Sequence, residues 1–380
     1  MQNTNNNIFI SAGESSGDLL GADLARALLK KNPALKLTGM GGKKMRDAGV
    51  KIQFESEKLA VVGLIEIIKH FPAILIMWHN IKKYLRDNKP DLVILIDFPD
   101  THFRIMKTAK KLGIPVLYYV SPQIWAWRAG RIKQIKKQVD HMAVLFSFEE
   151  KIYRDANIPV TFVGHPLGNI VKPTLSKNEI TTLLTLNPNK PVVTLLPGSR
   201  HSELTNHLPI IIESVKKIQA AHPEAQFVLA LANHLDKKTI ANLLPPSIQL
   251  IQNHLYDVLQ ISDAVIAVSG TVTLEVGLMQ TPLCIIYRFS PLTYWVAKKL
   301  IRVKQVGLCN IVAEKEIAKE FIQDDVTADN ISTEITHLIT DKQYNQNMRM
   351  ALSPIRSRVT HPTKNSSDCV ADIALTMLTK

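Results

Sequence analysis

The chain has 380 residues, 46% of them hydrophobic, and 46 Lys and Arg against 33 Asp and Glu give it a formal net charge of +13. The length suffices for two domains with large buried cores, and the charge indicates a polyanionic partner: nucleic acid, an anionic membrane or a phosphorylated substrate. Three scattered cysteines without a Cys-x-x-Cys pair argue against a disulfide framework or zinc site, and the polar, uncharged first seven residues are unlike a secretory signal, so we expect a cytoplasmic protein.

Short apolar runs alternate with segments of helical periodicity in both halves of the chain. The predicted strands are residues 8–12, 35–39, 92–96, 116–120, 142–146 and 160–163, then 192–196, 227–231, 248–251, 264–268 and 283–287. We therefore predict an α/β fold of two Rossmann-like, doubly wound domains, residues 1–168 and 169–365, that face one another across a cleft at the carboxyl ends of their strands. A last helix, 366–380, is expected to pack back on the first domain.

The turn at residues 13–18, Gly-Glu-Ser-Ser-Gly-Asp, leads from the first predicted strand into a predicted helix over 19–30. Its glycines lack the G-x-G-x-x-G spacing, and acidic residues at both ends would repel a pyrophosphate, so a nicotinamide dinucleotide site is disfavoured. A sugar acceptor fits the turn better. We expect Asp18 to be the N-cap of the helix.

Asp97 directly follows the very apolar predicted strand 92–96. A carboxylate at the carboxyl end of a central parallel strand points into the cleft, where partial burial raises its pKa and suits it to accept a proton from a hydroxyl. We predict that Asp97 is the catalytic base and that Asp100 caps the following helix.

Two loops of the second half have the composition of a nucleotide site. After strand 264–268, small residues leave backbone N–H groups free for a phosphate, and the carboxylate of Glu275, one turn into the next helix, can chelate a ribose diol. After strand 192–196, the guanidinium of Arg200 can bind phosphate oxygens as a leaving group gathers charge. An ordinary α/β turn with a solvated Glu275 is the alternative. The predicted diphosphate contacts are Ser199, Arg200, Ser269, Gly270 and Thr271.

The histidines and cysteines do not form a metal motif. The 12 histidines include no H-E-x-x-H pattern, the chain has no D-x-D, and we predict no metal site. His102 and His165 are expected to be structural or to support the site, and Cys284 to be core. In the segment 125–128, Trp125 and Trp127 are expected to be mainly structural and Arg128 to face ligand or membrane.

Residues 59–78 are more apolar than a surface helix pair should be. Charged and proline residues interrupt the segment, so it cannot span a bilayer as ~20 clean apolar residues would. A second segment, 292–308, mixes aromatic, aliphatic and basic residues as a helix in a membrane interface does. Core packing is the alternative for both segments, and for the second it is the equal alternative. The predicted membrane and acyl-chain contacts are Val61, Leu64, Ile68 and Leu75.

These motifs occur in the order found in one family. They are 13–18, 96–100, 119–122, 125–128, 164–167, 196–200 with Glu203, 269–275, 287–288, 290–293 and Asn310. From about residue 8 to its end the chain resembles the lipid-A-disaccharide synthases, inverting glycosyltransferases of GT-B architecture. The Ser-Pro-x-x-Trp-Ala-Trp-Arg and Gly-Glu-x-Ser-Gly-Asp segments are specific to this family. The chain departs from the pattern at Thr101-His102, where Phe-Asn is common, and at Ser15, where Ala is usual.

The resemblance implies a hexosyltransferase of lipid A biosynthesis. In this reaction UDP-2,3-diacylglucosamine donates its sugar to the 6-hydroxyl of 2,3-diacylglucosamine 1-phosphate (lipid X), giving the β-1,6-linked disaccharide 1-phosphate and UDP. By similarity the first domain binds the acceptor and the second the donor, Asp97 deprotonates the acceptor, and Arg200 with residues 269–271 stabilises the departing UDP. Glu275 holds the ribose, Glu14 and Asn310 line the cleft, and Ser15 lies in the same acceptor turn.

The resemblance also implies a cellular setting. It predicts no metal cofactor, no nucleic-acid partner, and peripheral association with the anionic cytoplasmic face of the inner membrane of a Gram-negative cell. The resemblance leaves open whether the protein forms a homodimer. The competing interpretations are a UDP-sugar epimerase of the same fold, a non-catalytic lipid-binding module and, least favoured, a nicotinamide enzyme.

Overall fold

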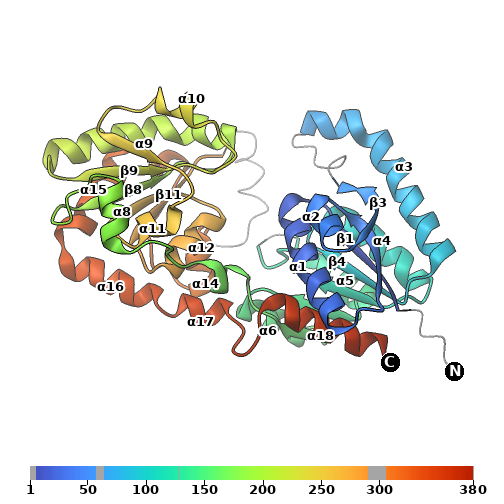
Figure 1. The fold of residues 1–380 in the computed structure, drawn as a ribbon. Helices are drawn as coiled ribbons and strands as arrows, with labels where there is room; N and C mark the ends of the chain where they lie inside the picture. Colours follow the sequence, from blue (N-terminus) through green and yellow to red (C-terminus); the bar gives the residue numbers. More distant parts are fainter. Residues whose placement is uncertain (1–5, 57–63, 127, 290–304, 380) are drawn as a thin grey trace. The chain divides into compact units, whose positions relative to one another are not determined.

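The computed structural model describes residues 6–56, 64–126, 128–289 and 305–379, and for residues 64–74 it describes the backbone alone. The chain divides into two compact units, Met1–Pro166 with Thr360–Lys380 and Leu167–Val359. Each unit is built on one parallel sheet (Figure 1). The predicted fold class, two doubly wound α/β domains, is confirmed.

The first sheet has the strand order β3-β2-β1-β4-β5-β6-β7. Its strands are β1 (Asn7–Ala12), β2 (Lys36–Gly41), β3 (Lys51–Glu55), β4 (Leu92–Ile96), β5 (Val116–Tyr119), β6 (His141–Val144) and β7 (Val160–Phe162). The described helices of this unit are α1 (Ser15–Lys31), α2 (Lys43–Asp47), α3 (Leu64–Asn88), α4 (Pro99–Lys111), α5 (Ile132–Gln138), α6 (Ser147–Asp155) and α18 (Ser366–Leu378).

The second sheet has the strand order β10-β9-β8-β11-β12-β13. Its strands are β8 (Val192–Leu196), β9 (Gln226–Ala230), β10 (Ile248–Ile251), β11 (Ala264–Val268), β12 (Leu283–Tyr287) and β13 (Glu320–Ile322). The described helices are α7 (Leu167–Ile170), α8 (Lys177–Leu183), α9 (His201–Ala221), α10 (Lys237–Ala241), α11 (Leu255–Leu259), α12 (Thr271–Leu278), α14 (Leu308–Ala313), α15 (Ala328–Thr340), α16 (Lys342–Leu352) and α17 (Ile355–Val359).

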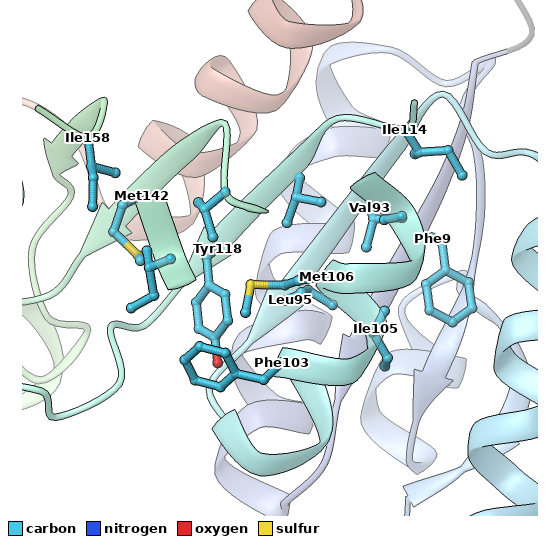
Figure 2. Close-up of a cluster of buried hydrophobic side chains, with 14 of the residues drawn as sticks. Phe9, Val93, Leu95, Phe103, Ile105, Met106, Ile114, Tyr118, Met142 and Ile158 are labelled. Atoms are coloured by element: carbon cyan, nitrogen blue, oxygen red, sulfur yellow. The ribbon is translucent and has the colours of Figure 1, made fainter. Parts of the chain in front are cut away.

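Helices cover both faces of the first sheet. On one face, core residues of β1, β4 and β5, among them Phe9, Leu95 and Tyr118, pack with Phe103 and Met106 of α4 (Figure 2). On the other face α18 packs against α1 and β4 (Figure 1), and Lys31 donates to the carboxylate of Asp372 at 2.8 Å. Burial on both faces explains why the central strands are continuous apolar runs.

The two strands that apolar runs do not predict, β3 and β13, lie at sheet edges. Neither contains a fully buried residue, whereas all five residues of β4 are buried. An edge strand is less completely buried than a central one and tolerates charged residues, as in these two strands, so a continuous apolar run is not required there.

Asp18 does not cap its own helix, so that prediction is wrong. Glu14 holds the N-cap position of α1, and the buried carboxylate of Asp18 accepts hydrogen bonds from the backbone N–H groups of Gly42 at 2.7 Å, Lys44 at 3.0 Å and Met45 at 3.2 Å. Asp18 therefore caps α2, a neighbour in space. Its role is structural, as expected, but it acts on another helix.

Each sheet has one topological switch point, which its strand order defines. Winding reverses between β1 and β4 in the first sheet and between β8 and β11 in the second. Ligands of open α/β sheets bind outside the carboxyl ends of the strands at such points. The turn that begins at Gly13, Asp97, the loop before Arg200 and the loop at 269–271 directly follow these four strands.

Candidate active site

Asp97 lies at a strained end of β4. Asp97 and Phe98 both have left-handed backbones, with φ of 51° and 50°. Such a conformation costs a residue other than glycine roughly 1–2 kcal/mol. Gly13, at the end of neighbouring β1, makes room for this turn, because a Cβ there would lie 2.1 Å from the ring of Phe98. Strain of this kind persists at functional sites where the surroundings over-determine it.

Three hydrogen bonds hold the strained residue. The backbone N–H of Asp97 donates to the carbonyl of Tyr119 at 3.0 Å, and its carbonyl accepts from the Tyr118 hydroxyl at 2.9 Å and from Nδ1 of His102 at 2.5 Å. The other ring nitrogen of His102 lies 2.9 Å from the hydroxyl of Ser11. Burial lowers the pKa of His102 to about 3, so the ring is neutral, with Nδ1–H as donor and Nε2 as acceptor. His102 supports the backbone of Asp97.

The carboxyl group of Asp97 is half-buried and electrostatically tuned. Burial raises its pKa above the ordinary value of 3.8, the N–H of Phe98 opposes this, and the carboxylate of Glu14 raises it further. Glu14 and Ser15 are exposed, and no side chain caps the first turn of α1. The structure thus brings the predicted base beside the predicted acceptor turn.

Asp100 does not cap α4, so that prediction is wrong. Phe98 holds the N-cap position, and the carboxylate of Asp100 pairs with Arg131 and, at 3.2 Å, with Arg128. The guanidinium of Arg128, predicted to face ligand or membrane, is half-exposed and forms this ion pair. Trp127 lies outside the described residues.

A second buried carboxyl group lies on the same cavity as Asp97. The cavity has a volume of about 190 Å³, and its wall includes Asp97, Ser121, Trp125, Phe146 and Glu149. Glu149 is 2% exposed, and its carboxylate accepts from the indole N–H of Trp125 at 3.1 Å and from the backbone N–H of Phe146 at 3.2 Å. No sequence pattern indicates a role for Glu149, because the residues that contact it come together only in the fold.

In the second unit, the side chain of Glu203, in the first turn of α9, reaches back to the loop after β8. Its carboxylate accepts from the backbone N–H groups of Ser199 at 2.8 Å and Arg200 at 3.2 Å. Gly198 has a φ of 109°, and a Cβ there would lie 2.6 Å from Glu203. Two of the loop amides that we expected to approach an anion therefore already have a carboxylate partner. The group this loop presents is the guanidinium of Arg200, which is 73% exposed and 3.8 Å from Glu203.

The loop after β11 is open. The hydroxyl of Ser269 donates to the carbonyl of Val306 at 2.8 Å, which fixes the loop. A Cβ built on Gly270 would meet no atom within 4 Å, and no side-chain hydrogen bond caps the first turn of α12. Thr271 is exposed at the same helix start. An uncapped helix N-terminus with room before it suits an anion.

Glu275 is held by a residue that the sequence analysis missed. The hydroxyl of Tyr256, on α11, donates to the Glu275 carboxylate at 2.7 Å. Burial raises the pKa of Glu275, and the Tyr256 hydrogen bond lowers it. Tyr256 precedes Glu275 by 19 residues on another helix, so no local signal could have paired them.

Asn310 was expected to contact the ligand, and its side chain is instead used within the protein. It is fully buried, its amide donates to the carbonyl of Ala318 and the carboxylate of Glu320, and its oxygen accepts from the N–H groups of Ile317 and Ala318. These four bonds favour a role in shaping the segment around α14. Among the described residues no group of three His, Cys, Asp or Glu is placed to hold a metal ion.

Solved structures identify the fold class to which this architecture belongs. The glycosyltransferase of kitacinnamycin matches with a TM-score of 0.64 at 17% identity, over 98% of this chain and 99% of that one. The calicheamicin glycosyltransferase matches with a TM-score of 0.60 at 15% identity, over 98% of each chain. The UDP-GlcNAc 2-epimerase from Neisseria meningitidis bound to UDP-GlcNAc gives 0.62 at 16% identity, over 97% and 100%. The shared fold is GT-B.

Sequence identifies the family within this class. The model of the family described as lipid-A-disaccharide synthetase matches residues 8–374. The lipid-A-disaccharide synthase of Coxiella burnetii (strain Dugway 5J108-111) is 50% identical over 356 residues, 94% of this chain and 95% of that protein. That of Geobacter sulfurreducens is 45% identical over 382 residues, 100% and 99%. The chain belongs to the lipid-A-disaccharide synthase family and is a glycosyltransferase, which confirms the predicted family and enzyme class.

The burial of Glu149 predicts a pH-dependent stability difference. Burial raises its pKa from the ordinary 4.5 to about 7, against the opposing bonds from Trp125, Phe146 and Ser121. The folded state then binds more protons than the unfolded state, so the stability contribution of Glu149 falls as pH rises from about 4.5 through about 7. Glu149→Gln cannot ionise. Between pH 4.5 and pH 8, its free energy of unfolding should gain roughly 3 kcal/mol relative to wild type.

Chemical denaturation at the two pH values measures this difference. Glu150→Gln is the control, because Glu150 lies on the same helix and pairs at the surface with Arg154. An equal wild-type-to-variant difference at both pH values would contradict the buried ionisable role of Glu149.

Proposed function

We propose that this chain transfers 2,3-diacylglucosamine from UDP-2,3-diacylglucosamine to the 6-hydroxyl of 2,3-diacylglucosamine 1-phosphate, forming the β-1,6-linked disaccharide 1-phosphate and UDP. The observation that carries the proposal is the carboxyl group of Asp97, fixed on a strained strand end at a switch point and raised in pKa by burial. Family membership supplies the substrates. The first unit binds the acceptor and the second binds the donor.

Asp97 acts as the general base. Its carboxylate takes the proton of the acceptor 6-hydroxyl while the hydroxyl oxygen forms a bond to the anomeric carbon of the donor, and the bond from that carbon to the UDP oxygen breaks. A pKa above the ordinary range makes the carboxylate a better proton acceptor near neutral pH. Displacement from the face opposite the leaving group inverts the anomeric centre.

The second unit holds UDP by charge and by the ribose. The start of α12 at Ser269, Gly270 and Thr271 receives the diphosphate, and the exposed guanidinium of Arg200 neutralises the charge that grows on it as the bond breaks. Glu275, oriented by Tyr256, accepts hydrogen bonds from the ribose hydroxyls.

Replacement of Asp97 tests the base. Asp97→Asn should keep UDP binding but lose ~10²–10⁴-fold in turnover, since that is what a positioned base contributes. Disaccharide formation from the two lipid substrates measures turnover, and the shift in melting temperature with UDP measures binding. Asp91→Asn, at the amino end of the same strand, is the matched control. Near-normal turnover in Asp97→Asn would show that another residue is the base. A wild-type protein that makes no disaccharide would contradict the proposed reaction.

Replacement of Arg200 tests charge stabilisation in the donor half. Arg200→Ala should lower kcat by ~10²-fold as well as weaken UDP binding, because charge on the diphosphate is greater in the transition state than in the ground state. Steady-state kinetics with varied donor separates the two effects. Lys238→Ala, an exposed cation of α10, is the control. A raised donor KM with unchanged kcat would make Arg200 a ground-state binder only.

We propose that the enzyme is a peripheral protein on the anionic cytoplasmic face of the inner membrane. Leu75 and Ile76 of α3 are 43% and 62% exposed. Farther along this helix a groove of about 660 Å³ is lined by cations of α3 and α4, namely Lys82, Arg86, Arg104, Lys107 and Lys111. Each basic residue near an anionic surface adds ~1 kcal/mol. Among the described residues, no helix is both long and apolar enough to cross a bilayer.

Polar substitution on α3 tests membrane docking. The side chains of Val61, Leu64 and Ile68 lie outside the described residues, so the test uses Leu75→Ser with Ile76→Ser. The pair should weaken binding to phosphatidylglycerol vesicles roughly tenfold, because two side chains lose apolar contact, and leave UDP binding unchanged. Leu183→Ser with Leu243→Ser, at 57% and 58% exposure in the second unit, is the matched control. Equal loss in both pairs would contradict docking through α3.

A further inference from the structure

We propose that Glu149 and Asp97 form a subsite of the first unit that binds the two free ring hydroxyls of the acceptor sugar. Glu149 accepts a hydrogen bond from the 4-hydroxyl, and Asp97 accepts one from the 6-hydroxyl, whose proton it then removes. This inference rests on the proposed function and deepens it. An acceptor acylated at positions 2 and 3 and phosphorylated at position 1 keeps free hydroxyls only at positions 4 and 6, which are neighbours on one edge of the ring.

The cavity shared by the two carboxyl groups has the size of such an edge. Its volume is about 190 Å³. Pockets that enclose whole small ligands are larger, at ~300–1,000 Å³. The cavity therefore takes part of the acceptor, and its wall of Asp97, Ser121, Trp125 and Glu149 presents hydrogen-bonding groups to that part.

The carboxylate of Glu149 is fixed and still has acceptor capacity. Trp125 donates to Oε1 and the backbone N–H of Phe146 donates to Oε2, so each oxygen keeps lone-pair capacity. The Ser121 hydroxyl and the backbone N–H of Leu145 add polar contacts to the carboxylate. The Ser121 hydroxyl also donates to the carbonyl of Pro122 at 2.9 Å and lies 2.7 Å from the hydroxyl of Tyr153. A carboxylate held in place by donors on one side is a preorganised acceptor for hydroxyl donors on the other.

Helix capping alone does not explain Glu149. Its carboxylate accepts from the backbone N–H at the start of α6, as Glu179 does at the start of α8. Glu179 makes its bond on the surface, and its hydrogen bonds with Ser176 lower its pKa. Glu149 is buried on a cavity, where ionisation costs free energy. Because a cap needs no burial, the cost indicates a second use for the carboxyl group.

The negative charge of the subsite favours ligand groups that donate hydrogen bonds over ligand groups that are anionic. Two carboxyl groups on one cavity, with Glu14 close enough to raise the pKa of Asp97, repel a phosphate. They attract groups that donate hydrogen bonds, and sugar hydroxyls are such donors. The 1-phosphate of the acceptor must therefore lie away from this wall.

The experiment combines a variant with an altered acceptor. Wild type, Glu149→Gln and the control Glu150→Gln are each assayed at pH 8, above the raised pKa of Glu149, with lipid X and with its 4-deoxy analogue. A hydrogen bond to a charged group is worth ~10–100-fold in affinity, so Glu149→Gln should raise the acceptor KM at least tenfold and leave the donor KM unchanged. The 4-deoxy acceptor should cost wild type a similar factor, and Glu149→Gln should add no further loss with it.

The outcomes separate this inference from the function on which it rests. A wild-type enzyme with equal acceptor KM for lipid X and the 4-deoxy analogue overturns the subsite, whether or not the variant folds. An equal loss in Glu149→Gln with both acceptors also overturns it, since a merely structural role would act on both alike. A wild-type protein that forms no disaccharide from either acceptor fails the proposed function instead.

Discussion

Two successive non-glycine residues with left-handed backbones end β4, and hydrogen bonds from outside that strand hold them there. The left-handed conformation costs roughly 1–2 kcal/mol of free energy per residue, and each hydrogen bond stabilises it by about 0.5–1.5 kcal/mol. The surrounding hydrogen bonds and packing are therefore needed to maintain the conformation. Tyr118 and His102 both donate to the carbonyl of Asp97, which fixes the carboxyl group at the carboxyl end of the sheet. The core that positions Tyr118 (Figure 2) is therefore also the support of the base.

The direction of the pKa shift, rather than burial alone, distinguishes the carboxyl groups of the candidate site from the surface helix caps, since Asp18 is buried and has a structural role. Glu179 and Asp236 cap helices, and their hydrogen bonds lower their pKa values. Asp97, Glu149 and Glu275 lie near strand ends, and burial raises theirs. A raised pKa means that the fold is less stable with the group ionised, and functional sites are where such a cost is retained. Both units follow this division, since each presents its site at the carboxyl ends of parallel strands.

The sequence predicts what depends on local pattern. Central strands are visible because burial on both faces requires continuous apolar runs, and Asp97 stands out because a carboxylate follows such a run. Edge strands β3 and β13 were not predicted, since their partly buried positions include charged residues, whereas edge strand β7 was predicted because its short run has none. Roles that depend on distant contacts also escape: Glu149 meets Trp125 across 24 residues, and Asp18 caps a helix 24 residues away. The structural role of Asn310 could not be predicted for the same reason, because its burial and its four hydrogen bonds arise only in the fold.

The pH dependence of kcat, measured with both substrates saturating so that the effect of Glu149 on the acceptor KM does not enter, tests the central claim, that the clamped and buried Asp97 is the base, most directly. We predict an acidic limb whose apparent pKa lies above the ordinary 3.8 of an aspartate, and the loss of that limb from the residual activity of Asp97→Asn. The same limb, with the same apparent pKa, in Asp97→Asn would contradict the claim.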